Sequence, residues 1–372
     1  MAKHNAANER IKREYFRFLA EAKGRDTATI DRVAKSLARF EADTRHKDFK
    51  RFHREQAMAF KRRLGEQVNA RTGEALSKAT VHSTQREVKT FFEWLAREPG
   101  YRSHIAFADA DYLSPNEKDV AIARARRERP VPSLEQVEAV MAAMPAATAL
   151  DRRDRALVAF TTITAARVNA LRTFRVGNVN IPQSYVEQDA RTVATKFAKS
   201  FRTWFMPVSE TALAIVADWV RELREEHLRA DSDVMFPGTA MGIGEAGGFQ
   251  PQGLARTGWD STGPIREVFR RAFASAGLSY FNPHSFRATL VHHAMRLGLG
   301  PEEFKAWSQN LGHSDVMTTF VSYGRVPVQR QGDLIRAARE ARGTPARRDQ
   351  IASLESLLAG LRAGTAGEVA PP

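Results

Sequence analysis

Residues 283–324 read PHSFRATLVHHAMRLGLGPEEFKAWSQNLGHSDVMTTFVSYG. Three groups stand out in this stretch: His284 with Arg287 three residues later, His313 in the tripeptide LGH, and Tyr323 ten residues after His313. Each group alone carries little information, since a His and Arg pair is usually a surface feature and a tyrosine ring is more often part of a core or an interface. Their occurrence in this order is the informative feature.

Two further cationic positions precede this stretch. Arg167 follows a segment of about 150–165 whose pattern predicts a helix, and Lys196 lies in a patch rich in strand-forming residues. We expect three strands there, at 184–188, 191–195 and 202–208, with residues 196–200 in the second turn. These predicted strands, set among predicted helices, indicate the fold class: the chain is expected to be mainly α, with a small antiparallel β-sheet in a second, mixed α/β domain.

The rest of the second half is helical around one Gly-rich segment. Ser133 with Gln136 predicts a capped helix start. Residues 238–253 lack the GK[ST] ending of a phosphate-binding loop, and we expect a flexible surface insertion there. Apolar residues at helical spacing predict two more helices; they are Leu213, Val216, Val220 and Leu223, and then Ile265, Val268, Phe269 and Ala272.

The first hundred residues predict four helices. Asp26 and Thr27 are candidate caps for the second of them. The apolar positions that define the four are Ile11, Tyr15, Phe18 and Leu19; Ile30, Val33, Leu37 and Phe40; Phe52, Phe60 and Leu64; and Val81, Val88, Phe91, Phe92 and Leu95.

A boundary is expected at residues 114–132. This segment combines three prolines with clustered arginines, and such a composition predicts an extended, exposed, basic linker. The expected organisation is a helical DNA-binding domain over 1–113, the linker over 114–132, a catalytic domain over 133–342 and a tail over 343–372. The prolines and arginines are Pro115, Arg124, Arg126, Arg127, Arg129, Pro130 and Pro132.

Composition restricts the function further. The 372 residues contain 57 Lys and Arg against 43 Asp and Glu, a formal net charge of +14, and residues 1–130 hold 29 basic and 19 acidic residues. Such an excess indicates a nucleic-acid partner, although a merely soluble basic protein is the alternative. The absence of cysteine excludes disulfides, zinc–thiolate sites and cysteine nucleophiles. A polar start at residues 1–10 and the lack of long apolar runs predict a cytoplasmic, nucleoid-associated protein without membrane contact.

Taken together, the ordered cationic residues and the final tyrosine resemble the tyrosine recombinase (phage integrase) family. The resemblance covers most of the chain: a helical DNA-clamping domain, a basic linker and a mixed catalytic domain. It implies a site-specific recombinase that cuts and rejoins DNA without cofactor or metal. The residues it assigns to catalysis are Arg167, Lys196, His284, Arg287, His313 and Tyr323.

The chemistry of strand cleavage accounts for these residue types. Two guanidiniums, Arg167 and Arg287, can neutralise the charge on a five-coordinate phosphorus, with His313 donating a further hydrogen bond. A phenol needs a base at neutral pH, which we assign to His284. Lys196 could protonate the departing 5′ oxygen, and the covalent 3′-phosphotyrosine would conserve the bond energy. Because cations neutralise the charge, no metal is required, and no carboxylate or cysteine near His292 and His293 would complete a metal site.

Four departures from the family pattern bear on activity. Ala165 stands where the family usually has glycine, and Ala170 stands where it has an acidic residue that helps to order the site. Ala288 replaces a histidine, and Tyr323 lies one residue further from His313 than is usual. Lys199 is a possible substitute for Lys196, and His293 falls at a later histidine of the family's His-Arg motif.

The resemblance also implies partners. We expect double-stranded DNA with paired inverted repeats, a homo-tetramer in the synaptic complex and, as a further class of partner, accessory DNA-bending proteins. An apolar stripe at 351–361 predicts a tail helix that docks on a neighbouring protomer or on its own domain. Two other functions stay open: a non-cutting DNA-binding protein on the same scaffold, and type IB topoisomerase-like strand relaxation.

Overall fold

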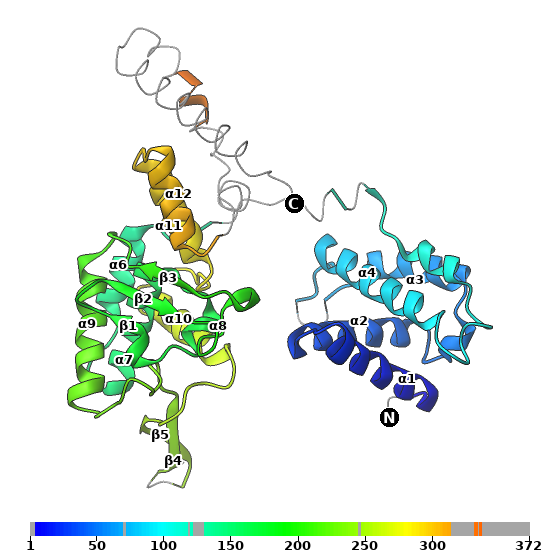
Figure 1. Cartoon of the computed structure of the whole chain (residues 1–372), viewed down its shortest axis with the longest axis horizontal. Coiled ribbons are helices and arrows are strands. Elements are labelled where there is room, and N and C mark those ends of the chain that lie inside the picture. The colour runs from blue at the N-terminus through cyan, green and yellow to red at the C-terminus, as the bar shows by residue number, and fades with distance from the viewer. Residues whose placement is uncertain are drawn as a thin grey trace, which may run out of the picture. The chain divides into compact units, whose positions relative to one another are not determined.

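The computed structural model (Figure 1) describes residues 4–69, 72–117, 120–121, 130–244, 247–313, 331–333 and 335–336. The chain divides into two compact units, residues 1–127 and 128–372. Each unit has its own hydrophobic core, one around the aromatic residues of the first four long helices and one around the helix over 149–164.

Four long helices form the first unit, as the apolar spacing predicted. Asp26 caps the second through its carboxylate, which accepts from Thr29 N at 2.7 Å, and Ser77 caps the fourth through Thr80 N. Short π- or 3-10 turns follow or connect them at Phe18–Ala22, Phe49–Arg51 and Phe107–Leu113. The helices are α1 (Ala6–Arg17), α2 (Thr27–Asp43), α3 (Arg54–Glu66) and α4 (Lys78–Leu95).

The core of this unit is unusually rich in phenylalanine. Phe52 stacks on Phe92 with the ring centroids 3.7 Å apart, and Phe40 makes edge contacts at 5.0 Å with both Phe60 and Phe92. These rings are almost fully buried, so they contribute a large apolar area to the contacts between the helices.

The segment expected to be a linker is only partly described. Residues 117, 120 and 121 are helical, and Val120 N donates to Asn116 O, so the start of the segment is not extended. The four arginines at 124–129 lie outside the described residues. At its end, Pro132 O accepts a 2.6 Å hydrogen bond from Thr289 Oγ1, which fixes the entry to the second unit.

The second unit is built around α7 (Ala149–Thr164), whose last nine residues are all buried and which packs along α9 (Glu210–Glu225). The predicted capping box at Ser133 and Gln136 is confirmed: Gln136 N donates to Ser133 Oγ, and Ser133 N donates to Gln136 Oε1. The other helices are α6 (Leu134–Ala143), α8 (Val168–Leu171), α10 (Gly263–Ser275), α11 (Ser285–Arg296) and α12 (Pro301–Asn310).

A three-stranded antiparallel sheet lies in this unit in the order β1 (Val179–Asn180), β2 (Tyr185–Gln188), β3 (Phe201–Trp204). Two of the predicted strands are present, but the strand predicted at 191–195 is wrong. Asp189 explains this, because its side chain accepts from Arg191 N and its carbonyl accepts from Thr192 N and Val193 N, which folds the chain into a turn.

The Gly-rich segment, predicted as a flexible surface insertion, forms the largely exposed hairpin β4 (Thr239–Ile243) and β5 (Phe249–Leu254), which extends from the body of the unit in Figure 1. Its two strands were not predicted. A bulge at Ala240 and Met241 interrupts its register. Mainly α with small antiparallel sheets is nevertheless the correct fold class for the chain.

Candidate active site

Arg167 is positioned by the sharp reversal between α7 and α8. Ala165 ends α7 in the left-handed conformation, φ 47°, and its N–H donates to Thr161 O at 2.8 Å. Ala166 N donates to Thr164 Oγ1, after which Arg167 begins α8 with its side chain half-buried. A left-handed residue is where glycine costs least, so the glycine usual in the family fits this position better than alanine does.

Lys196 lies in the connection between β2 and β3. It begins a 3-10 turn, Lys196–Ala198, and is exposed. Ala194 N, two residues earlier, donates to Thr173 Oγ1 at 2.8 Å, which attaches this connection to the residues just after α8. The lysine therefore projects from a loop that is tied to the segment bearing Arg167.

His284 and Arg287 lie at the N-terminus of α11. Asn282 shapes this entry, because its side chain accepts from His284 N at 3.0 Å and its carbonyl accepts from Ser285 Oγ at 2.7 Å. Arg287 is only 3% exposed. Its Nη1 donates to Ala165 O at 2.9 Å, and its Nη2 donates to Leu311 O. One guanidinium thus joins α7, α11 and the end of α12.

His313 completes the group. Arg287 Nη2 lies 3.0 Å from His313 Nε2. Because a guanidinium can only donate, Nε2 accepts this bond and the proton of the neutral ring is on Nδ1. Gly312, just before it, has φ +70°, and a Cβ there would lie 2.6 Å from the Phe201 ring. The left-handed backbone and the nearby ring both favour glycine here, where the chain passes close to β3 and brings His313 to Arg287.

The electrostatics show that these groups are neighbours. Partial desolvation, followed by the positive charges of Arg287, Arg167 and Lys196, lowers the pKa of His284. Burial, followed by the charges of Arg287 and Arg167, lowers the pKa of His313 to about 4. Both imidazoles are therefore neutral at pH 7, within a region of concentrated positive charge. Such a region suits an anionic phosphate, and a neutral histidine can accept a proton.

Five of the six predicted site residues are thus brought together, and the sixth, Tyr323, lies outside the described residues. His293 belongs to a different environment, since burial and Arg296 are the main causes that lower its pKa. Ala170 is buried in the large core beside α7. Sequence reasoning missed the backbone carbonyls of Ala165 and Leu311, which no side-chain pattern could have indicated.

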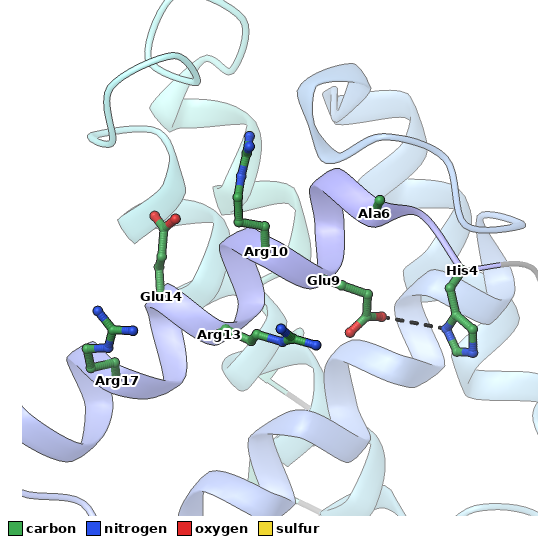
Figure 2. Close-up of a pocket in the computed structure, with 7 residues that line it drawn as sticks. All are labelled: His4, Ala6, Glu9, Arg10, Arg13, Glu14 and Arg17. Atoms are coloured by element: carbon green, nitrogen blue, oxygen red, sulfur yellow. Dashed lines mark ion pairs between the residues drawn. The ribbon is translucent and has the colours of Figure 1, made fainter.

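A surface pocket lies away from these residues, in the first unit. It is an open hollow of about 940 Å³ along α1, and an ion pair of 3.6 Å joins His4 and Glu9 at one end (Figure 2). Both arginines and glutamates line it, so it presents charges of both signs. It contains none of the predicted site residues.

Two other kinds of feature are absent from the described ranges. There, no three or more His, Cys, Asp or Glu side chains gather closely enough to hold a metal ion. No helix in that part of the chain combines the length and apolar character needed to cross a membrane.

Comparison with known proteins decides the family. The model of the phage integrase family matches residues 133–330, just over half of the chain. The chain belongs to the phage integrase family. Tyrosine recombinase XerC 2 of Ralstonia nicotianae (strain ATCC BAA-1114 / GMI1000) is 26% identical over 164 residues, 44% of this chain and 43% of that relative. The match therefore spans less than half of the relative's length.

Solved structures of other proteins share the fold. A lambda integrase(75–356) dimer bound to a COC′ core site is 14% identical, with a TM-score of 0.56, over 84% of this chain and 93% of that one. XerH site-specific recombinase bound to palindromic difH substrate is 13% identical, with a TM-score of 0.57, over 87% and 84%. At these identities the likeness concerns the fold of this phage integrase family member.

Proposed function

We propose that this chain is a site-specific DNA recombinase that cuts and rejoins DNA through a 3′-phosphotyrosyl intermediate on Tyr323. The observation that carries the proposal is the buried contact of Arg287 with His313, inside a cluster that also includes Arg167, Lys196 and His284. Membership of the phage integrase family supports the same reaction.

The proposed cleavage step is a transesterification. The Tyr323 oxygen forms a bond to phosphorus while the bond from phosphorus to the 5′ oxygen breaks, so no net bond energy is lost. His284, neutral because its pKa is lowered, takes the phenolic proton. Lys196 gives a proton to the departing 5′ oxygen. Arg167 and Arg287 stabilise the extra negative charge on the phosphate, and His313 would add a hydrogen bond from Nδ1.

The assignment of partners and domains is also part of this proposal. The lambda integrase and XerH structures hold DNA sites, one of them palindromic, which supports paired inverted repeats as substrate. We assign DNA binding to residues 1–113, a linker to 114–132, catalysis to 133–342 and inter-protomer docking to the tail, 343–372. Recombination would take place in a homo-tetramer, with accessory DNA-bending proteins as a further possibility, and would integrate, excise or resolve a DNA element.

The test is covalent capture. Full-length protein is incubated with nicked duplexes made from the DNA that flanks its gene, and adducts are resolved on denaturing gels. Tyr323→Phe should bind DNA and form no adduct, whereas Tyr280→Phe, a matched change at an exposed tyrosine, should form as much as the parent. An adduct with Tyr323→Phe would contradict the nucleophile.

The alternatives give different results in the same experiment. DNA binding without any adduct from the parent protein would support a non-cutting binder, for which Ala170 in place of the usual carboxylate is the motivating feature. Adducts and relaxation of supercoiled plasmid, without reciprocal joining of two sites, would support a topoisomerase-like enzyme.

A further inference from the structure

The outer edge of β3 is closed by one side chain. Asn310, the last residue of α12, accepts from Trp204 N at 2.7 Å through Oδ1 and donates to Trp204 O at 2.8 Å through Nδ2. An amide side chain has both a donor and an acceptor, so it can pair with a strand as a neighbouring strand would. Thr203 Oγ1 adds a 3.1 Å bond to Asn310 O.

This contact joins two parts of the candidate site: the hairpin that carries Lys196, and the 310–313 segment that contacts Arg287. Upstream of it, β3 follows directly on the connection that carries Lys196. Downstream, Leu311 O accepts from Arg287, and His313 follows three residues after Asn310. The Phe201 ring also packs against Gly312, so the strand and the 310–313 segment are in contact at two points.

The hairpin does not depend on Asn310 for its existence. β2 and β3 pair through four residue pairs, and Gln188 Nε2 donates to Thr203 Oγ1 at 2.8 Å within that pairing. The Trp204 side chain is 51% exposed, so Asn310 contacts strand backbone at the margin of the fold. Loss of its amide should leave the hairpin intact and loosen its outer edge, while the bond from Thr203 Oγ1 to Asn310 O and the Phe201 contact with Gly312 remain.

We propose that Asn310 is a positioning residue that holds the Lys196 hairpin in register with Arg287 and His313, so that Lys196 reaches the departing 5′ oxygen. The inference rests on the proposed recombinase chemistry. Its consequence is selective: Asn310 serves the protonation of the leaving group, and the attack by Tyr323 is unaffected.

The leaving group itself supplies the test. In DNA with sulfur in place of the bridging 5′ oxygen, the departing thiolate is a much weaker base than an alkoxide and needs no proton. A nicked flanking duplex is prepared with oxygen or with sulfur at the cleaved bond. Lys196→Ala should be slow on oxygen and recover on sulfur, which establishes that the assay reports protonation.

Asn310→Ala should behave in the same way. We expect its adduct formation on oxygen to fall by about 10- to 100-fold, the effect typical of displacing a reacting group by an ångström, and to return to within about threefold of the parent on sulfur. Gln309→Ala, an exposed neighbour on the same helix, is the matched control and should match the parent on both substrates.

Two results would overturn the proposal. An equal slowing of Asn310→Ala on oxygen and sulfur would mean that the residue merely supports the fold, and parent-like rates on both would mean that it positions nothing. If Asn310→Ala does not fold, Asn310→Asp, which keeps the acceptor for Trp204 N and loses the donor to Trp204 O, takes its place with the same two readouts. A parent protein that cleaves neither substrate would instead refute the proposed function.

Discussion

Protonation of His313 should destabilise the second unit in acid. The ring is 7% exposed, and burial with the charges of Arg287 and Arg167 lowers its pKa from 6.5 to about 4. A base whose folded pKa is depressed stabilises the fold fully above its unfolded pKa and loses that contribution as the pH falls through the folded value. The relevant window therefore extends from about pH 6.5 down to about pH 4.

The size of the effect follows from the two pKa values. Each unit of difference is about 1.4 kcal/mol, so His313 should lower the free energy of unfolding by about 2 kcal/mol at about pH 5 and by about 3 kcal/mol at about pH 4. His313→Gln cannot be protonated, but its amide oxygen can still accept from Arg287. The difference between the two proteins isolates His313, because His284 and the carboxylates titrate in both.

Urea unfolding of the full chain, followed by tryptophan fluorescence between about pH 7.5 and 4.5, measures this difference. Four of the five tryptophans, at 204, 219, 259 and 307, belong to the second unit, so the signal reports mainly on it. The parent should lose more stability than His313→Gln as the pH falls. An equal loss of unfolding free energy in the two proteins would show that the fold does not hold His313 neutral, which would contradict its role as acceptor from Arg287.

Three further changes probe other parts of the fold. Gly312→Ala should destabilise the second unit by about 1–3 kcal/mol in urea unfolding, since its φ is +70° and the new Cβ meets Phe201; a cost near zero would contradict the close approach. Ser133→Ala removes one side of the capping box and should cost about 1 kcal/mol by calorimetry, whereas an unchanged transition would show that α6 needs no cap. Arg287→Lys keeps the positive charge but loses the paired Nη1 and Nη2 donors of the guanidinium. We therefore expect adduct formation to fall by at least about 100-fold while DNA affinity is nearly retained. An equal fall in DNA affinity would show that this arginine serves DNA binding alone.

Periodic apolar spacing predicted the long helices well. Leu37 and Phe40 in α2, and Val216 and Val220 in α9, lie on the buried faces that their spacing indicated. Local cap chemistry was equally informative, as Asp26 and Ser133 show. These features depend on residues within one or two turns of each other, and a sequence displays such relations directly.

The strands were harder to predict, because competing local bonds decided them. Val193 is buried, as a strand residue would be, yet the bonds to Asp189 fold residues 191–193 into a turn. In the 239–254 hairpin the glycines suggested an insertion without strands, yet Gly242 and Gly253 occupy paired strand positions. Neither outcome follows from residue propensity alone.

The site was predicted as a set of side chains, and its scaffold was not. The ordered motifs indicated Arg287 and His313, but not that Ala165 O would share the same guanidinium, nor that Asn310 would close the edge of β3. These contacts join residues more than 100 positions apart. These contacts depend on how α7, α11, α12 and the sheet pack together, and local sequence patterns do not predict that packing.

That separation has a kinetic consequence. The bond from Arg287 to Ala165 closes a loop of 122 residues, and the bond from Thr203 to Asn310 closes one of 107, whereas Arg32 and Glu87 in the first unit are 55 apart. Long loops cost more entropy to close, so contacts of high sequence separation form late in folding. A chain diluted from denaturant should therefore regain the helices of its first unit before Arg287 makes its contacts with Ala165 and His313. A newly made chain, emerging from residue 1 onward, would likewise complete its basic first unit before the cluster formed around His313.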